Sequence, residues 1–242
     1  MRLTVLHARA MTVELVRYPA YVVPTLVFPS VFFLFFSVPG SEAGATARMV
    51  TFAGFAAIGV AFFQFGVGIA IERGSPWEAY LRTLPIGVGA RLAARVLSAA
   101  VFATVASGGV LVVAVATTDA SLSPPHWVAL GLALLAGTVP FALLGIALGY
   151  WVPERGALPV ANLLYLGLAY AGGLWISARS LPQTVQAISP YLPTRALADA
   201  LVATTSRAPV AWGSWLALGG FGALFALLAA WGYRRDEGKR YR

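Results

Sequence analysis

Residues 49–71 read MVTFAGFAAIGVAFFQFGVGIAI, and this stretch decides the class of fold. It contains no acidic or basic side chain, and its apolar residues leave no polar face around a helix. A helix needs about 20 residues of this kind to cross a hydrocarbon core of about 30 Å. A helix in a soluble domain would instead keep one polar face toward water. The stretch therefore predicts a helix that spans a membrane.

The same pattern recurs along the rest of the chain. The apolar runs are approximately Tyr18–Val38, Met49–Ile71, Ala93–Val115, Trp127–Trp151, Ala157–Ser177 and Trp212–Tyr233. Their central portions carry no charge, the chain is 59% hydrophobic, and its mean hydropathy is +0.79. These values exclude an ordinary soluble domain. We predict an all-α membrane protein with six transmembrane helices in a single domain over residues 1–242.

The excess of basic residues follows the expected sides of the membrane. The chain holds 17 basic and 9 acidic residues. If the N-terminus is cytoplasmic, the outer segments carry only Arg48, Arg179, Arg195 and Arg207, and all other basic residues lie inside. This bias predicts cytoplasmic termini, with a basic tail at 234–242. The richness in Ala, Gly, Val and Arg, with a single Lys, is typical of a bacterial protein, so we expect the plasma (inner) membrane of a bacterium. We expect membrane lipids, through anionic headgroups at the inner leaflet, to be partners, and nucleic acid not to be one.

The sequence also limits the chemistry that the chain can carry. Cysteine is absent, and His7 and His126 are predicted on opposite sides, so no metal site is expected. The single lysine, Lys239, does not stand in a phosphate-binding loop, which requires Gly-x-x-x-x-Gly-Lys followed by Ser or Thr. The deepest polar side chains, Gln64 and Asn162, do not titrate and cannot carry protons. We therefore expect no catalysis by this chain and a power source elsewhere.

Two further segments lack the length to span. Residues 1–17 place Leu3, Leu6, Ala10 and Val13 on one helical stripe, which favours an in-plane helix at the inner interface. A simple extension of the first span is the alternative. The proline-rich segment 178–210 is interpreted as short helices that dip into, or lie on, the outer boundary. A loose outer loop is the alternative there.

The connection at residues 72–85 reads ERGSPWEAYLRTLP and has the signature of a short helix. Ser75 is a good N-cap, and Pro76 stands at the first helical position, where its missing N–H does no harm. Glu78 completes a capping box, and Pro85 marks the end. One face of this helix presents the apolar residues Trp77, Tyr80, Leu81 and Leu84. The pattern alone fits equally well a helix docked in the groove of a partner and aromatic residues seated at the membrane interface.

The connection at residues 72–85 also carries a family resemblance. A Glu72-Arg73 pair ends the second run, and Gly74-Ser75, the short helix and Thr83-Leu84-Pro85 follow before a basic third run. This arrangement resembles the permease subunit of bacterial type-2 ABC exporters, as does the outer segment Ile188–Thr194. Pro76-Trp77 departs from the Thr-Leu-like residues expected there. The resemblance implies six spans, an N-terminal interfacial helix, a coupling helix and short outer helices before span six.

The resemblance further implies an assembly and its partners. Two permease subunits, identical or paralogous, would work with two cytoplasmic ATP-binding cassette subunits. ATP and Mg²⁺ would bind the partner subunits, and this chain would bind no cofactor. The residues expected to dock and couple the ATPase are Glu72, Arg73, Ser75, Trp77, Glu78, Tyr80, Leu81 and Leu84.

The conduit would form between the two permease copies, from spans one, two and five. The candidate lining residues are Phe33, Gln64, Asn162 and Tyr165. The alternatives are interhelical hydrogen bonds for the polar residues and core packing for the aromatic ones. A pathway without charge favours amphipathic, drug-like or lipid-like cargo. Export of a polysaccharide or glycolipid is one alternative, and a non-transporting membrane anchor that recruits a soluble partner is another.

Overall fold

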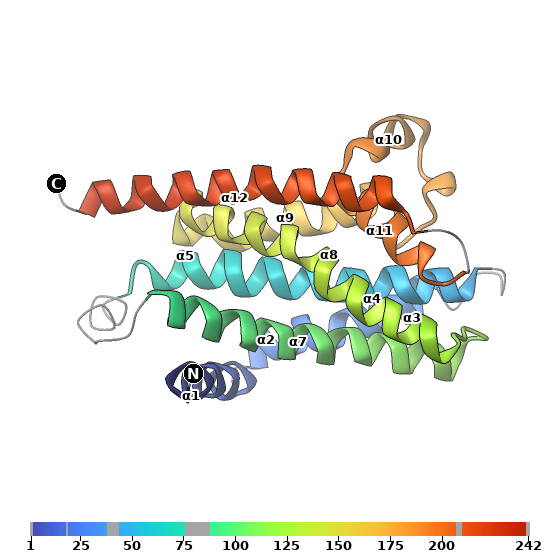
Figure 1. Ribbon diagram of the computed structural model, residues 1–242, viewed down its shortest axis with the longest axis horizontal. Helices are drawn as coiled ribbons and strands as arrows, with labels where there is room; N and C mark the ends of the chain where they lie inside the picture. The colour runs from blue at the N-terminus through green and yellow to red at the C-terminus, as the bar shows by residue number, and fades with distance from the viewer. Residues whose placement is uncertain (1, 18, 38–43, 76–87, 207–209, 241–242) are drawn as a thin grey trace.

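The computed structural model describes residues 2–17, 19–37, 44–75, 88–206 and 210–240 of the chain (Figure 1). Within these ranges the secondary structure is helical, without strands. Among the described residues, four helical stretches are long and apolar enough to cross a membrane: Ala45–Glu72, Ala93–Thr117, Pro124–Trp151 and Trp212–Asp236. They coincide with the second, third, fourth and sixth predicted spans. The prediction of an all-helical, multi-pass membrane protein is therefore confirmed.

The first predicted span is a helix of three short pieces. α2 (Pro19–Val22), η1 (Val23–Val27) and α3 (Phe28–Phe36) follow one another, and η1 has the wider turn of a π-helix. The N–H of Phe28 donates to the carbonyl of Val23, five residues back. Pro29 explains the irregularity, because its ring would clash with the carbonyl four residues earlier in a regular α-helix.

The fifth predicted run ends earlier than its composition suggested. α9 (Glu154–Ala171) stops at Gly172, and Gly173 takes a left-handed φ of +80°. The N–H of Leu174 donates to the carbonyl of Ala169 at 3.0 Å, and that of Gly173 to Tyr170 at 3.0 Å. These are the two hydrogen bonds of a Schellman motif. The predicted boundary at Ser177 is therefore wrong by six residues. The count of six spans stays a prediction for the first and fifth runs.

The long helices lie side by side, with the second span at the centre (Figure 1). This span runs through α4 (Ala45–Ala61), the π-helix η2 (Phe62–Val67) and α5 (Gly68–Glu72). It packs against α7 (Val88–Thr117) and α8 (Pro124–Trp151), and α12 (Trp212–Arg240) packs on α8. The most apolar window of the second span is 78% buried, whereas that of α12 is 17% buried. The second span is therefore the core of the bundle, and α12 lies at its edge.

Glycines allow α8 to approach the central span closely. A Cβ added at Gly145 would lie 2.7 Å from the carbonyl oxygen of Ala61, and one at Gly149 would lie 2.8 Å from Ile69 Cβ. Small residues serve this purpose in membrane bundles, where close backbone packing replaces much of the hydrophobic driving force. The glycines of α8 thus fix the distance between the two helices.

The segment between α9 and α12 folds back into the bundle. It forms η3 (Ala178–Ser180), α10 (Gln183–Ile188), η4 (Ser189–Tyr191) and α11 (Pro193–Ala203). α11 is largely buried against α4, α8, α9 and α12. Leu201 fills the space above Gly54, and Leu197 fills the space above Gly137. The expectation of short helices agrees with this arrangement, while their depth in the membrane stays a prediction.

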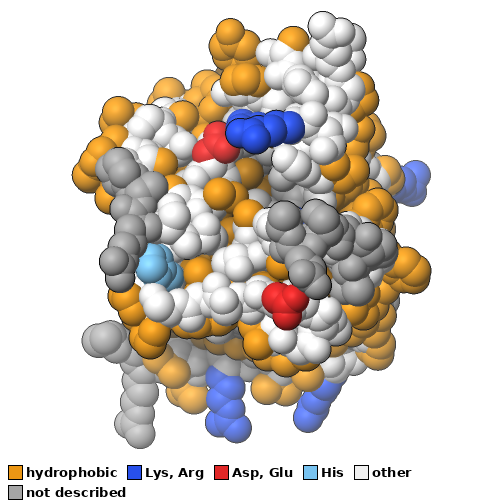
Figure 2. Space-filling view, turned by 90° about the vertical axis from the view of Figure 1, so that its right-hand side faces the viewer, with side chains coloured by type: hydrophobic (Ala, Val, Ile, Leu, Met, Phe, Trp, Pro, Cys, Tyr) orange, Lys and Arg blue, Asp and Glu red, His pale blue; other side chains and the backbone are white. Residues whose placement is uncertain are grey.

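The N-terminal helix α1 (Arg2–Val16) runs across the long helices and packs on α7 (Figure 1). This direction suits the predicted in-plane helix. The end of the bundle opposite to α1 carries few charged side chains on the face seen in Figure 2. Basic residues stand on α1 itself, at the end of α5, at the start of α9 and near the end of α12, at Arg9, Arg73, Arg155 and Arg235. Which of the two ends is cytoplasmic stays a prediction.

Candidate functional site

The predicted coupling segment begins inside the described part of the chain and continues outside it. Glu72 is the last residue of α5, and Arg73 is its C-cap. A turn follows, in which the N–H of Ser75 donates to the carbonyl of Glu72 at 2.9 Å. The remaining predicted docking residues lie outside the described residues: Trp77, Glu78, Tyr80, Leu81 and Leu84. The described part of the predicted site is therefore its first residues, at the end of the second span.

Arg73 joins this base to the ends of two other long helices. Its Nη1 donates to the backbone oxygen of Tyr150 at 2.9 Å, and its Nη2 donates to that of Val152 at 2.8 Å. Both carbonyls belong to the C-terminal end of α8, where a helix has no internal donors for them. Nη1 also binds the carboxylate of Asp236 on α12 at 3.0 Å. Arg73 thus caps α8 and holds α12 against it.

The contact between α8 and α12 is reinforced beside Arg73. The indole Nε1 of Trp151 donates to the carbonyl of Leu228 at 3.0 Å, and its ring meets Trp231 edge-on at 4.8 Å. The guanidinium of Arg235 lies 5.2 Å from the centre of the Trp151 ring, within the range of a cation–π contact. Gly232 permits this approach, because a Cβ there would come within 2.8 Å of Trp151 Nε1. The ends of α8 and α12 beside Arg73 therefore form one packed unit.

Glu72 reaches in a different direction from Arg73, toward α7. Its carboxylate pairs with Arg95, whose other terminal nitrogen donates to the backbone oxygen of Gln64 at 3.1 Å. Arg95 is only 8% exposed, and a buried guanidinium requires such partners. The amide of Gln64 donates to the hydroxyl of Ser98 at 2.9 Å, and the hydroxyl of Thr12 on α1 lies within hydrogen-bond distance of the same oxygen, at 3.1 Å. A continuous polar chain thus links α5, η2, α7 and α1.

Glu72 and Arg73 are neighbours in the chain, but their side chains bind different helices. Successive residues of a helix point about 100° apart, so Glu72 and Arg73 meet different neighbours. Glu72 connects to α7 and, through Ser98, to α1. Arg73 connects to α8 and α12. Through these contacts the two residues are connected to four other helices, α1, α7, α8 and α12.

The candidate conduit residues occupy different surroundings. Phe33 is fully buried, and Gln64 is buried with its amide on Ser98. Tyr165 donates its hydroxyl to the carbonyl of Phe55 at 3.1 Å and stacks on that ring with centroids 4.6 Å apart. Asn162 is half-buried on α9. Only Tyr165 and Asn162 therefore share an element, and the lining role of all four residues stays a prediction.

Tyr165 belongs to an aromatic cluster that joins the first, second and fifth predicted spans. The members of this cluster are Phe28, Phe32, Phe36, Phe55, Tyr165 and Trp175. Trp175 meets Phe32 edge-on at 4.9 Å and Phe55 edge-on at 5.4 Å. Phe28 is 38% exposed and Phe36 is 46% exposed, so one side of the cluster is open. Such rings can contact an apolar or planar molecule on that side.

Comparison with known proteins identifies the family to which this arrangement belongs. Residues 3–205 match the family described as ABC-2 type transporter. The chain belongs to the ABC-2 type transporter family. It is similar to the protein named "Putative transport permease YvfS" of Bacillus subtilis (strain 168), with 26% identity over 223 residues, 90% of this chain and 91% of the relative. No solved structure matches the chain.

Family membership confirms the resemblance read from residues 72–85 and makes the chain the membrane subunit of a transporter. A permease of the ABC-2 family is a non-catalytic transport subunit and works with ATP-binding cassette partners. Glu72 and Arg73 lie at the start of the segment 72–85, whose sequence carried the family resemblance.

Sequence reasoning missed three residues of this ABC-2 permease that complete the site. Arg95 and Asp236 pair with Glu72 and Arg73, and Trp175 closes the aromatic cluster. A signal existed for the first two, because opposite charges at the ends of apolar runs on one side of the membrane can pair. Trp175 carried no such signal, since its position depends on the turn that ends α9.

Proposed function

We propose that this protein is the permease subunit of an ATP-driven exporter. Two copies, or one copy and a paralogue, form the conduit, and two separate cytoplasmic subunits bind and hydrolyse ATP with Mg²⁺. This chain supplies no catalytic group and binds no cofactor of its own. It lies in the bacterial plasma membrane with both termini in the cytoplasm, as the distribution of arginines indicates.

The observation that carries this proposal is the divergence of contacts at Glu72 and Arg73. The segment that follows them, 76–84, has the sequence pattern of a short amphipathic helix with two aromatic residues on its apolar face. A push on that helix by an ATPase subunit would enter the bundle at its base. There Glu72 would pass it to α7, and Arg73 would pass it to α8 and α12. A membrane anchor without transport would have no need of this divided connection.

The aromatic cluster supports an uncharged or amphipathic cargo. Its open side presents Phe28 and Phe36, and none of its members is charged. Drug-like and lipid-like molecules fit such a wall. Sugars also stack on aromatic faces, so a polysaccharide or glycolipid is the second candidate cargo. A second permease copy that faces the exposed side of α3 and α9 would enclose the wall.

Reconstitution tests the power source directly. Proteoliposomes that hold the permease alone should show no uphill movement of fluorescent amphiphiles under a proton or sodium gradient. Addition of the cognate ATP-binding subunit with Mg-ATP should start transport, and a partner unable to hydrolyse ATP should not sustain it. Accumulation by the lone subunit under a gradient would contradict the proposal. A complex that assembles, hydrolyses ATP and moves no amphiphile, glycolipid or polysaccharide would favour the anchor instead.

The proposed docking role of the connection at residues 72–85 requires its own test. Trp77→Ala with Tyr80→Ala should release the ATP-binding subunit, or uncouple its ATPase activity, while membrane insertion stays normal. Co-purification of the two subunits measures the release. Full retention of the partner together with full transport would mean that the aromatic residues only seat the loop at the lipid surface.

A further inference from the structure

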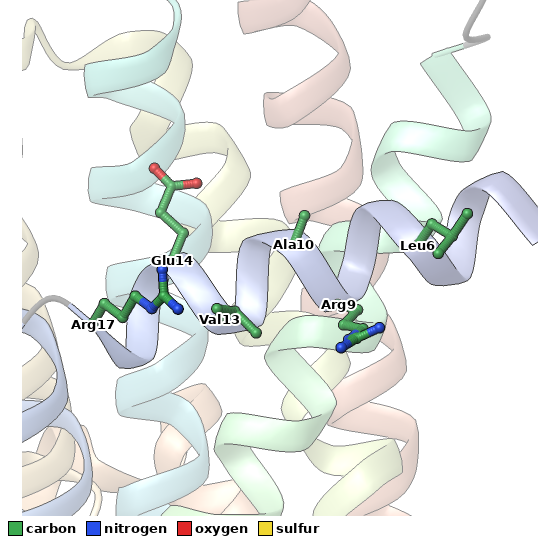
Figure 3. Close-up of a pocket in the computed structure, with 6 residues that line it drawn as sticks. All are labelled: Leu6, Arg9, Ala10, Val13, Glu14 and Arg17. Atoms are coloured by element: carbon green, nitrogen blue, oxygen red, sulfur yellow. The ribbon is translucent and has the colours of Figure 1, made fainter.

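The outward side of α1 carries a groove that the proposed transport function does not use. Its volume is about 580 Å³, and its lining side chains come from α1 and from Arg17, which directly follows this helix (Figure 3). The lining residues are Leu6, Arg9, Ala10, Val13, Glu14 and Arg17. Each of them is exposed. The groove is therefore an accessible strip along one face of a single helix.

The opposite side of α1 is fixed to the bundle, and this determines where the groove faces. Ala8 is 8% exposed, and the hydroxyl of Thr12 binds that of Ser98 on α7 at 3.1 Å. Leu6 and Val13, by contrast, are 55% and 40% exposed. The helix cannot turn to bury its apolar stripe without losing the contact with α7. The stripe must therefore be covered by something outside the described part of the chain.

The groove combines two kinds of recognition on one surface. Ala10 forms a low floor between Leu6 and Val13, which supply apolar walls. Arg9 and Arg17 flank this floor from positions about 12 Å apart along the helix axis. A guanidinium group can donate to two oxygens of one phosphate at once. Apolar side chains beside it can contact the glycerol and the upper acyl region of the same lipid.

We propose that this groove binds an anionic phospholipid of the leaflet at the α1 end of the bundle. Because α1 crosses the long helices, it lies along the plane of any membrane that those helices span (Figure 1). Its outward side then meets the boundary between headgroups and acyl chains. The two arginines outweigh the single carboxylate of Glu14, so a net negative headgroup is favoured over a zwitterionic one. This commits the surface to phosphatidylglycerol-like lipids.

Lipid retention measures this binding without any transport assay. Purified, delipidated permease is incubated with phosphatidylglycerol or phosphatidylethanolamine in detergent, and bound lipids are counted by native mass spectrometry. A basic residue near an anionic surface changes binding by about fivefold. Arg9→Gln with Arg17→Gln should therefore weaken phosphatidylglycerol binding about 25-fold and leave phosphatidylethanolamine binding nearly unchanged. Arg155→Gln with Arg234→Gln removes the same charge from exposed positions of other helices and serves as the matched control.

Two further variants separate the effect of the groove's shape from the effect of its charge. Ala10→Trp fills the floor of the groove and should reduce phosphatidylglycerol binding without a change of charge. Glu14→Gln should strengthen phosphatidylglycerol binding, because it removes the only negative charge among the lining residues. Correct insertion of every variant is checked by labelling a cysteine introduced at Ser121, since the chain has no cysteine of its own.

Several outcomes would overturn the proposal. An equal loss in the control pair would show that binding is spread over the basic end of the bundle. The wild type could retain phosphatidylethanolamine more strongly than phosphatidylglycerol, and Glu14→Gln could weaken that retention. This result would assign the groove to a zwitterionic headgroup. Unchanged lipid binding together with loss of the ATP-binding subunit would make the groove a protein contact.

Discussion

Arg73 is the residue whose loss should most disturb the end of the bundle at which it lies. Its guanidinium donates to two backbone carbonyls and to Asp236, at distances between 2.8 and 3.0 Å. A hydrogen bond with a charged partner contributes about 1.5–3 kcal/mol, but bonds that share one donor group are not additive. The side chains of Arg73 and Asp236 are 20% and 17% exposed, so water screens them only in part. We expect Arg73→Gln to lower the free energy of unfolding by about 2–4 kcal/mol.

Asp236→Asn should have a smaller effect, because it weakens only one of the three contacts. Arg73 keeps both carbonyls, and the asparagine oxygen still accepts a hydrogen bond. The expected loss is about 1 kcal/mol. In the double variant the second change removes a contact that the first has already broken. Its cost should therefore be about 1 kcal/mol smaller than the sum of the single costs.

Reversible unfolding in mixed micelles, followed by tryptophan fluorescence, measures these differences. The protein has seven tryptophans, and Trp151 lies beside Arg73's partners and should report locally. Arg234→Gln, an exposed change of the same charge on α12, should stay within about 0.5 kcal/mol of the wild type. Additive single effects, or an Arg234→Gln cost equal to that of Arg73→Gln, would refute the role of the pair.

Three further experiments test the packing, the polar chain and the orientation of the molecule. Gly145→Ala should destabilise the bundle by about 1–3 kcal/mol in the same unfolding assay, because its Cβ would meet the backbone of α4 at 2.7 Å. Gly131→Ala on the same helix meets no atom within 4 Å and should be neutral or slightly stabilising. Ser98→Ala should cost about 1 kcal/mol by leaving the amide of Gln64 without its acceptor, and an unchanged stability would show that water replaces the hydroxyl. A cysteine at Ser121 should react with an impermeant thiol reagent from outside intact cells, and one at Gly238 only after permeabilisation; the reverse pattern would invert the topology.

The long helices could be predicted from the sequence because lipid imposes a simple requirement on them. Every backbone group must be satisfied within the segment, so an uncharged apolar run of sufficient length forms a helix. The same composition could not locate the end of α9. Leu174 and Trp175 continue the apolar run, yet Gly173 reverses the chain and Leu174 becomes fully buried against the core. A hydrophobic residue just after a terminal glycine belongs to the Schellman motif, and hydropathy alone reads it as more helix.

The ion pairs depend on the tertiary structure and could not be predicted from the spacing of residues along the chain. Glu72 and Arg73 were predicted to act at the base of the coupling loop, but their partners lie 23 and 163 residues away. Composition could place Arg95 near the start of the third run and Asp236 after the last one. Only the packing of α7 against the central span, and of α12 against α8, decides which carboxylate meets which guanidinium. The position of α11 within the bundle depended in the same way on small residues of other helices, such as Gly54 and Gly137.

The two connections at the end of the second span differ in their exposure to water. The Glu72 side chain is 47% exposed, whereas its partner Arg95 is buried, so water reaches this pair from the Glu72 side only. Arg73 is largely enclosed and binds three acceptors on α8 and α12. We infer that α5, α8 and α12 would move as one body under a push from the coupling loop. The same push would reach α7 and α1 through the Glu72–Arg95 pair and the Gln64–Ser98 hydrogen bond, so the change of shape needed for transport would involve both groups of helices.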